Sequence, residues 1–145
     1  MTVDNDGPQP PQKLSLVVFS GAFDRIHYAL ATAAAAAAAA RPVTLFFTMD
    51  AIRALSRTVE DGSVGWTSID GARARDEAFA AAGVAGFEEL VTACTALDVR
   101  FMVCEMGLRV LGLTGADLRD DIKIFDGGIV SFLNDARADG AMLFV

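Results

Sequence analysis

The fold of this chain is decided by VRFMVCEMGLRVL, residues 99–111, because the pattern of apolar side chains changes in its middle. Residues 99–103 form a short apolar run, which is typical of a strand buried on both faces. After Cys104 the apolar residues recur at helical spacing, which predicts a helix over residues 105–111. A buried strand that runs directly into a helix is typical of a parallel α/β sheet, and here it places a thiol at the junction.

The remaining sequence repeats this alternation of strand and helix. Apolar runs rich in β-branched residues predict strands at residues 13–19, 42–48, 99–103, 122–125 and 141–145. Helical patterns cover residues 24–40, 50–55, 86–97 and 105–111, and Asp24 is the expected cap of the first. One more helical stripe is formed by Ile129, Phe132, Leu133 and Ala136. Alternating strands and helices predict a parallel sheet of about five strands, covered by helices on both faces.

The chain is predicted to be one domain, residues 13–145, preceded by a tail. Residues 1–12 hold three of the four prolines and no core-forming pattern, so we expect them to be disordered. The periodicity weakens again over residues 56–82, which glycines interrupt. We expect a mobile excursion there, with part of it, around residues 73–82, forming a helix.

The composition excludes several classes of function. A net charge of −7 without a cluster of basic residues disfavours nucleic-acid and membrane-surface binding. The uncharged stretch over residues 26–40 is too short to cross a bilayer, and the acidic N-terminus does not resemble a secretory leader, so a cytoplasmic location is expected. Two cysteines, one histidine and the absence of CxxC or HExxH motifs predict no metal and no other cofactor.

Cys104 is the leading candidate for chemistry. Backbone N–H groups at the start of the following helix favour a thiolate, although the neighbouring Glu105 opposes it. The alternative is a small buried hydrophobe, as most free cysteines are. Cys94 lies on the apolar stripe of its own helix and is expected to be a core residue that forms no disulfide with Cys104.

Other polar and small residues follow the predicted strands and are expected at the same sheet edge as Cys104. His27 falls in the first turn of its helix, where it either assists the thiol or is a half-buried histidine satisfied by a local hydrogen bond. Carboxylates such as Asp50 and Asp126 serve either the site or helix capping, and Trp66 anchors either a loop or a partner. The expected pocket residues are Ser20, Gly21, Phe23, Thr48, Met49, Asp50, Glu105 and Gly127.

Four segments resemble the DsrE/DsrF-like family. They are KLSLVVFSG with Phe23-Asp24 and HYAL at residues 13–30, RPVTLFFT at 41–48, GFEEL at 86–90 and FMVCEMG at 101–107. The resemblance extends over residues 13–145. Proteins of this type are sometimes labelled peroxiredoxin-like, but the PxxxTxxC pattern of a peroxidatic cysteine is absent here.

The resemblance implies a three-layer α/β/α fold and a homo-oligomer, often a trimer or hexamer. It also implies sulfur relay, in which Cys104 matches the cysteine that accepts sulfane sulfur as a persulfide. The implied partners are a rhodanese-like donor and a TusA-like carrier. Our leading hypothesis is therefore a sulfur carrier or sulfurtransferase. The alternative is a small-ligand or protein-binding assembly module with an inert Cys104, and a thiol redox enzyme is disfavoured because no resolving cysteine is suitably placed.

Overall fold

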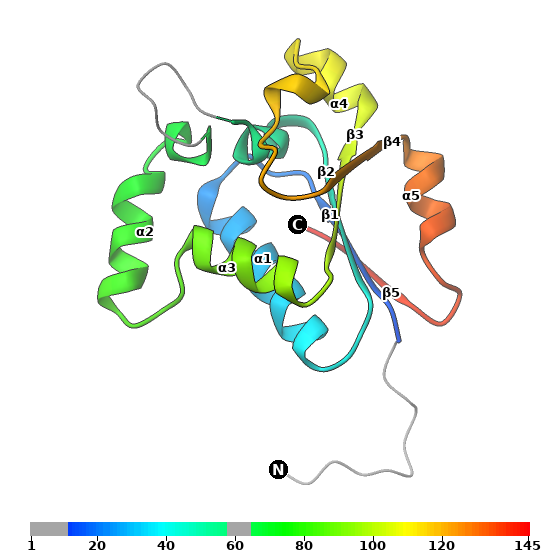
Figure 1. The fold of residues 1–145 in the computed structure, drawn as a ribbon, viewed down its shortest axis with the longest axis horizontal. Coiled ribbons are helices and arrows are strands. Elements are labelled where there is room, and N and C mark those ends of the chain that lie inside the picture. Colours follow the sequence, from blue (N-terminus) through cyan, green and yellow to red (C-terminus); the bar gives the residue numbers. More distant parts are fainter. Residues whose placement is uncertain (1–11, 58–64) are drawn as a thin grey trace, which may run out of the picture.

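The computed structural model describes residues 12–57 and 65–145, which form one parallel sheet with helices on both faces (Figure 1). The sheet has five strands in the order β4-β3-β2-β1-β5. Their bounds are β1 Leu14–Val18, β2 Val43–Phe47, β3 Arg100–Cys104, β4 Ile124–Gly127 and β5 Ala141–Phe144. The predicted three-layer α/β/α fold with a parallel sheet is confirmed.

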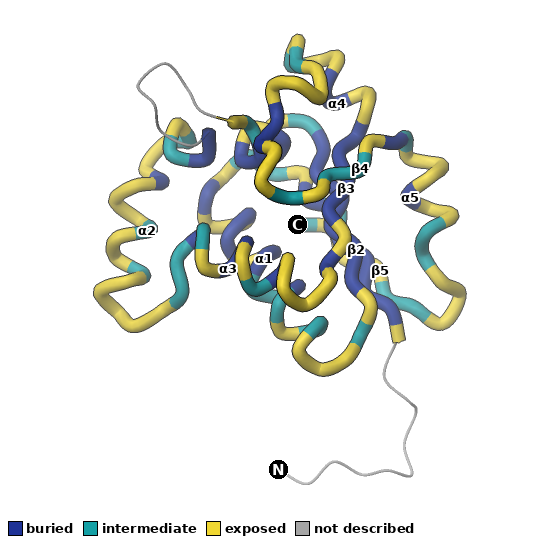
Figure 2. Tube along the Cα trace, viewed as in Figure 1, coloured by how far each residue is buried: buried dark blue, intermediate teal, exposed yellow. Residues whose placement is uncertain are grey.

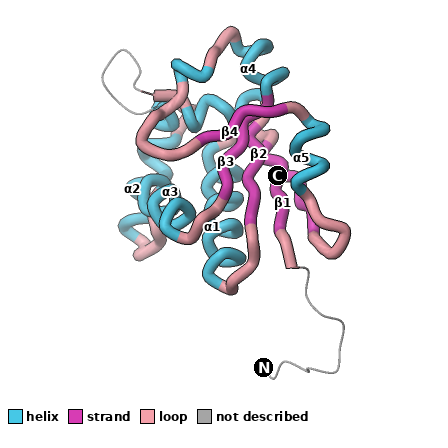
Figure 3. The backbone as a smooth tube through the Cα atoms, turned by 45° about the vertical axis from the view of Figure 1, so that its right-hand side comes forward, coloured by secondary structure: helices cyan, strands magenta, loops and turns pink. Residues whose placement is uncertain are grey.

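The helices are divided unequally between the two faces. One face carries α1 (Phe23–Ala38) and α3 (Phe87–Ala96), with α2 (Ala72–Ala81) outside α1 (Figure 1). Among the described helices, α5 (Ile129–Asp135) is the one that covers the other face. The short α4 (Glu105–Leu111) follows β3 at the carboxyl ends of the strands (Figure 3). The described residues also contain the 3₁₀ turns η1 Met49–Leu55, η2 Gly65–Ser68 and η3 Gly115–Asp117.

The strand order explains this division. The connections from β1 to β2 and from β2 to β3 progress across the sheet in one direction, so right-handed crossovers place α1 and α3 on the same face. The connection from β4 to β5 returns across the whole sheet, and the same handedness therefore places α5 on the opposite face.

The two faces have cores of very different size, because successive strand residues point to opposite sides. The face of α1 and α3 holds the main core, which includes Leu16, Leu45 and Phe47. The face of α5 holds a small cluster of Phe46, Met102, Cys104 and Phe132. In Figure 2 the central strands are dark blue, whereas most of α5 is yellow or teal.

Helix α1 begins earlier than expected and without a side-chain cap. Its N-cap residue is Ala22, and the predicted cap Asp24 lies in the first turn, where it pairs with Arg75 of α2 at 3.0 Å. The helix ends before Ala40, which adopts a left-handed backbone with φ of 64° ahead of Pro42. The alanine run between them gives high helix propensity with little side-chain volume.

The structure tests the predicted excursion only in part. Residues 65–82 contain η2 and α2, and α2 agrees with the helix expected around residues 73–82. The tail prediction for residues 1–11 and the centre of the excursion, residues 58–64, lie outside the described residues. Helix α2 packs on α1, so this part of the excursion lies on the face away from Cys104.

Two predictions near the C-terminal end were wrong in detail. Strand β4 is two residues further along than the expected run at 122–125, so Gly127, which was expected to follow the strand, is its last residue. In α5 only Phe132 is buried, whereas Ile129 and Leu133, which share its predicted stripe, are exposed. In the described parts of the chain, no helix combines the length and apolar character required to span a bilayer.

Candidate functional site

Cys104 is the last residue of β3 and the N-cap residue of α4. Its neighbour in the sheet is Gly127 of β4, which has no side chain to extend over the thiol. The Cys104 side chain makes no capping hydrogen bond to α4, and the residue is 0 % exposed. The thiol is therefore at the predicted strand-to-helix junction, but it is closed off from solvent in this conformation.

The wall around Cys104 is apolar and comes from the α5 face of the sheet. Phe101 and Val103 alternate into the main core, so Met102 and Cys104 point to the other side. There Cys104 belongs to a cluster with Phe46 and Phe132, whose rings stack at 4.6 Å between centroids. Helix α5 is thus the cover over the thiol.

The cover is attached at two places. Phe132 supplies the only buried side chain of α5, and Asp135 supplies a polar anchor at the end of the helix. One Asp135 oxygen accepts hydrogen bonds of 2.6 Å from Lys13 Nζ and of 2.6 Å from Thr44 Oγ1. Burial alone would raise the pKa of Asp135, but these hydrogen bonds outweigh it and the pKa is lowered.

The loops that follow β1, β2 and β3 approach one another closely at the carboxyl edge. A Cβ on Gly21 would lie 2.7 Å from the Cβ of Asp50, and one on Gly107 would lie 2.7 Å from the backbone nitrogen of Met49. Met49 itself has a left-handed backbone with φ of 49°, a conformation that is costly for a residue with a side chain. Glycines at residues 21 and 107 therefore allow this tight edge to form.

Most of the predicted pocket residues follow neighbouring strands at this edge. Ser20 Oγ accepts a hydrogen bond from the Ala22 N–H, Thr48 is buried, and Asp50 and Glu105 are exposed. Three surface hollows are lined by described residues, and Cys104 lines none of these three.

The predicted position of His27 beside Cys104 is wrong. His27 lies on the α1 face, where its ring stacks on Phe79 at 4.1 Å and its Nε2–H donates to the Ala85 carbonyl at 2.8 Å. Phe23, an expected pocket residue, is buried among the aromatic rings of the same face. Both side chains are separated from the thiol by the sheet itself. His27 is a buried histidine, and its hydrogen bond goes to a carbonyl far away in the sequence rather than to a local one.

Cys94 is a core residue, as predicted. It is fully buried on α3, its thiol donates to the Leu30 carbonyl at 3.5 Å, and burial raises its pKa to about 12. Both cysteines are free thiols, and they lie on opposite faces of the sheet. Cys94 therefore offers no thiolate at neutral pH and no disulfide partner for Cys104.

A second polar network, which the sequence analysis did not find, ties distant loops together. Arg119 is buried and donates two hydrogen bonds to Glu88 and two to Asp121, at 2.7–2.9 Å. Those to Asp121 and Glu88 raise the pKa of Arg119 despite its burial. Trp66 donates to Glu88 at 2.9 Å, so it anchors its own loop. No sequence motif marks this network, because its members are far apart in the chain.

The described residues offer no preformed metal site, since no three histidine, cysteine or carboxylate side chains among them are grouped closely enough to hold an ion. Together, the fold and site define a class: a parallel α/β protein with one cysteine at the carboxyl end of an inner strand. The chain belongs to the DsrE/DsrF-like family, whose model matches residues 12–137.

Two solved structures show the same fold. The MTH1491 protein from Methanobacterium thermoautotrophicum, described as a protein of unknown function, has 13% sequence identity and a TM-score of 0.61, and the match covers 92% of this chain and 98% of that one. The ychN protein from E. coli has 17% identity and a TM-score of 0.57, with 92% and 97% covered. A search of curated proteins found no match.

Proposed function

We propose that this protein is a sulfur carrier or sulfurtransferase that holds sulfane sulfur as a persulfide on Cys104. The observation that carries the proposal is the position of Cys104 at the end of β3, directly before α4 and opposite Gly127, in a chain of the DsrE/DsrF-like family. Gly127, the sheet partner of Cys104, presents no side chain beside the thiol.

The proposed reaction has two displacements at sulfur. The Cys104 thiolate attacks the outer sulfur of a donor persulfide, so that a new S–S bond forms and the donor leaves as its thiolate. An acceptor thiolate then attacks the outer sulfur on Cys104, and Cys104 leaves as a thiolate. Neither step needs an external oxidant or reductant. A rhodanese-like donor and a TusA-like carrier are the proposed partners, in a cytoplasmic setting where thiols stay reduced.

Access to the sulfur requires α5 to move, because Cys104 is fully covered by the cluster beneath this helix. The helix is well suited to move, since Phe132 is its single buried side chain and its N-terminal end follows Gly127 and Gly128. Docking of a donor or acceptor on α5 would expose the thiol. We propose that sulfur transfer takes place in this open form.

The direct test loads the purified chain with thiosulfate plus a rhodanese, or with a persulfidated donor protein, and measures intact mass. The proposal predicts a gain of one sulfur atom that is removed by dithiothreitol, lost in Cys104→Ser and retained in Cys94→Ser. Cys94 is the matched control, because it is an equally buried thiol on the opposite face. A gain that persists in Cys104→Ser, or no gain in a protein whose Cys104 can be alkylated, contradicts the proposal.

The second candidate function is a binding or assembly module in which Cys104 is inert. The complete burial of Cys104 favours it. Under this alternative, α5 stays closed, and Cys104 is alkylated only when the whole protein unfolds. The rate of Cys104 alkylation as a function of urea therefore separates the two functions.

A further inference from the structure

The two edges of the sheet differ sharply in character. Edge strand β4 is accompanied by charged groups: Arg100 and Lys123 lie over the ring of Phe125 at 4.0 and 4.7 Å, and Asp126 is exposed. Charges of this kind are a common protection of an edge strand against pairing. Edge strand β5 has the sequence AMLF, with no charge, proline or bulge.

The side chains of β5 are exposed on both faces of the sheet. Phe144 is 71 % exposed and contacts Phe19 at 5.4 Å between ring centroids, and Met142 is exposed on the same face. On the other face, Leu143 and Tyr28 line a hollow of about 580 Å³ between α1 and β5. We call these five residues the β5 surface. It is an apolar surface on both sides of a strand edge that has no partner among the described residues.

The backbone of β5 determines how another strand can pair with it. The N–H groups of Ala141 and Val145 donate to β1, so the polar backbone groups of Met142 and Phe144 point away from the sheet. Leu143, between these two residues, points its polar backbone groups towards β1. An antiparallel copy of β5 can therefore pair Met142 of each copy with Phe144 of the other copy. In this register the two Leu143 residues lie opposite each other on the two-fold axis.

We propose that the β5 surface is an interface with a second copy of this chain, in which the two β5 strands pair antiparallel and join both sheets. The register places Met142 against an aromatic ring of the second copy, a favourable sulfur–aromatic contact, and Leu143 against Leu143. Every exposed apolar side chain of the strand thereby gains an apolar neighbour. The surface is self-complementary, which is what a two-fold interface requires.

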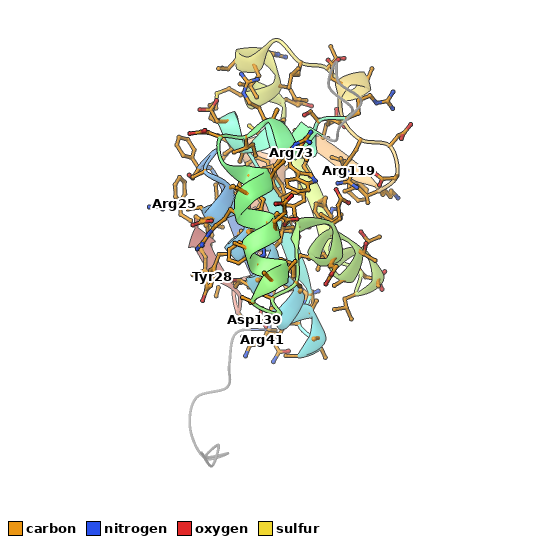
Figure 4. All side chains as sticks on the ribbon, turned by 90° about the vertical axis from the view of Figure 1, so that its left-hand side faces the viewer. Arg25, Tyr28, Arg41, Arg73, Arg119 and Asp139 are labelled. Carbon is orange, nitrogen blue, oxygen red and sulfur yellow. The ribbon has the colours of Figure 1, made fainter. Side chains whose placement is uncertain are left out.

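The area that pairing can bury agrees with this occupant. Complete burial of the exposed fractions of the five side chains, at about 200 Å² for each aromatic one, would remove roughly 500 Å² per copy, or about 1,000 Å² in total, which is the threshold for a specific interface. Figure 4 shows Tyr28 between Arg25 above it and Asp139 with Arg41 below it. Antiparallel pairing brings Arg25 of each copy towards both Asp139 and Arg41 of the other, so these charges neither favour nor oppose it.

Cysteine cross-linking tests the register in the full chain. Leu143→Cys places two thiols across the axis with Cα atoms about 4.5 Å apart, within the range for a disulfide. Phe144→Cys is the matched control, because its two copies are roughly 7–8 Å apart along the diagonal and cannot join without movement. We expect rapid, reductant-sensitive dimer formation for Leu143→Cys and little for Phe144→Cys. Equal cross-linking of the two variants, or none in Leu143→Cys, overturns the register.

Light scattering of the unmodified chain tests the interface itself. We expect an even number of copies and a halved mass for Phe144→Lys, with a circular dichroism spectrum like that of the wild type. Val130→Lys is the control for an added charge, since Val130 is equally exposed on α5, and its mass should not change. A monomeric wild type, an odd-numbered assembly unaffected by Phe144→Lys, or dissociation only by Val130→Lys overturns the proposal.

Discussion

Replacing Phe132 with alanine is expected to open the cover over Cys104 without exposing the main core. Phe132 is the one buried side chain of α5 and stacks on Phe46 at 4.6 Å. Truncation of a buried phenylalanine costs about 3–5 kcal/mol. The state with α5 detached has already lost this contact, so the whole cost favours opening.

At 1.4 kcal/mol for each factor of ten, the population of the open state rises roughly a hundredfold to a few thousandfold. The assay is alkylation of Cys104 by iodoacetamide, followed by peptide mass spectrometry. The reagent concentration is kept low, so that α5 detaches and returns faster than Cys104 is labelled and the rate reports the open population. The Cys104 rate should rise by that factor and depend weakly on urea, because detachment of one short helix exposes little surface. Cys94, with its pKa raised to about 12, reports global unfolding in the same tube.

Leu133→Ala is the matched control, because Leu133 is on the same helix but already half exposed, and its effect should stay within about threefold. The reasoning is refuted if Cys104 of Phe132→Ala is labelled no faster than in the wild type. It is also refuted if Cys104 and Cys94 show the same urea dependence, since Cys104 would then open only with the whole protein.

Three further results are expected. Asp135 has a lowered pKa, so its contribution to stability is complete at neutral pH and is lost as the pH falls below about 4. Urea titrations should show that Asp135→Asn is about 2 kcal/mol less stable at pH 7 and does not lose this stability in acid. An acid profile like that of the wild type would contradict the role of Asp135 as an anchor. Gly107→Ala should cost about 1–3 kcal/mol in the same titrations, because its Cβ meets the Met49 backbone at 2.7 Å, and a neutral effect would show that η1 yields easily. Arg119→Met should leave Glu88 without its bidentate partner and lower the free energy of unfolding by about 1–3 kcal/mol. The loss caused by Arg119→Met should be smaller in a chain that also carries Glu88→Gln. Additive losses would show that the two residues are not coupled.

Much of the fold could be predicted from local pattern. The apolar runs at β1, β2, β3 and β5 lie within one or two residues of the observed strands, and α4 has the predicted bounds of residues 105–111. These elements are predictable because a strand buried on both faces must be apolar throughout. The position of Cys104 at the carboxyl edge follows from the same reasoning.

The sequence could not show on which face each side chain lies. Cys104 and His27 both come near the carboxyl edge, but they are on opposite sides, because the strand order places α1 and α5 on opposite faces and Cys104 points to the α5 face. Strand order depends on long-range pairing, which no local periodicity encodes. For the same reason the stripe of Ile129, Phe132 and Leu133 predicted three buried residues, although the sheet leaves only Phe132 covered.

The pairing of β5 with β1 also has a consequence for how the chain is made. Leu14 is the sheet partner of Ala141, so the two strands that complete this side of the sheet come from opposite ends of the domain. During synthesis, β1, α1 and β2 leave the ribosome long before residues 141–144 exist. Until then β1 is itself the open edge, with its outer backbone groups unpaired. The exposed edge of the nascent chain is therefore β1, which is an inner strand of the finished protein.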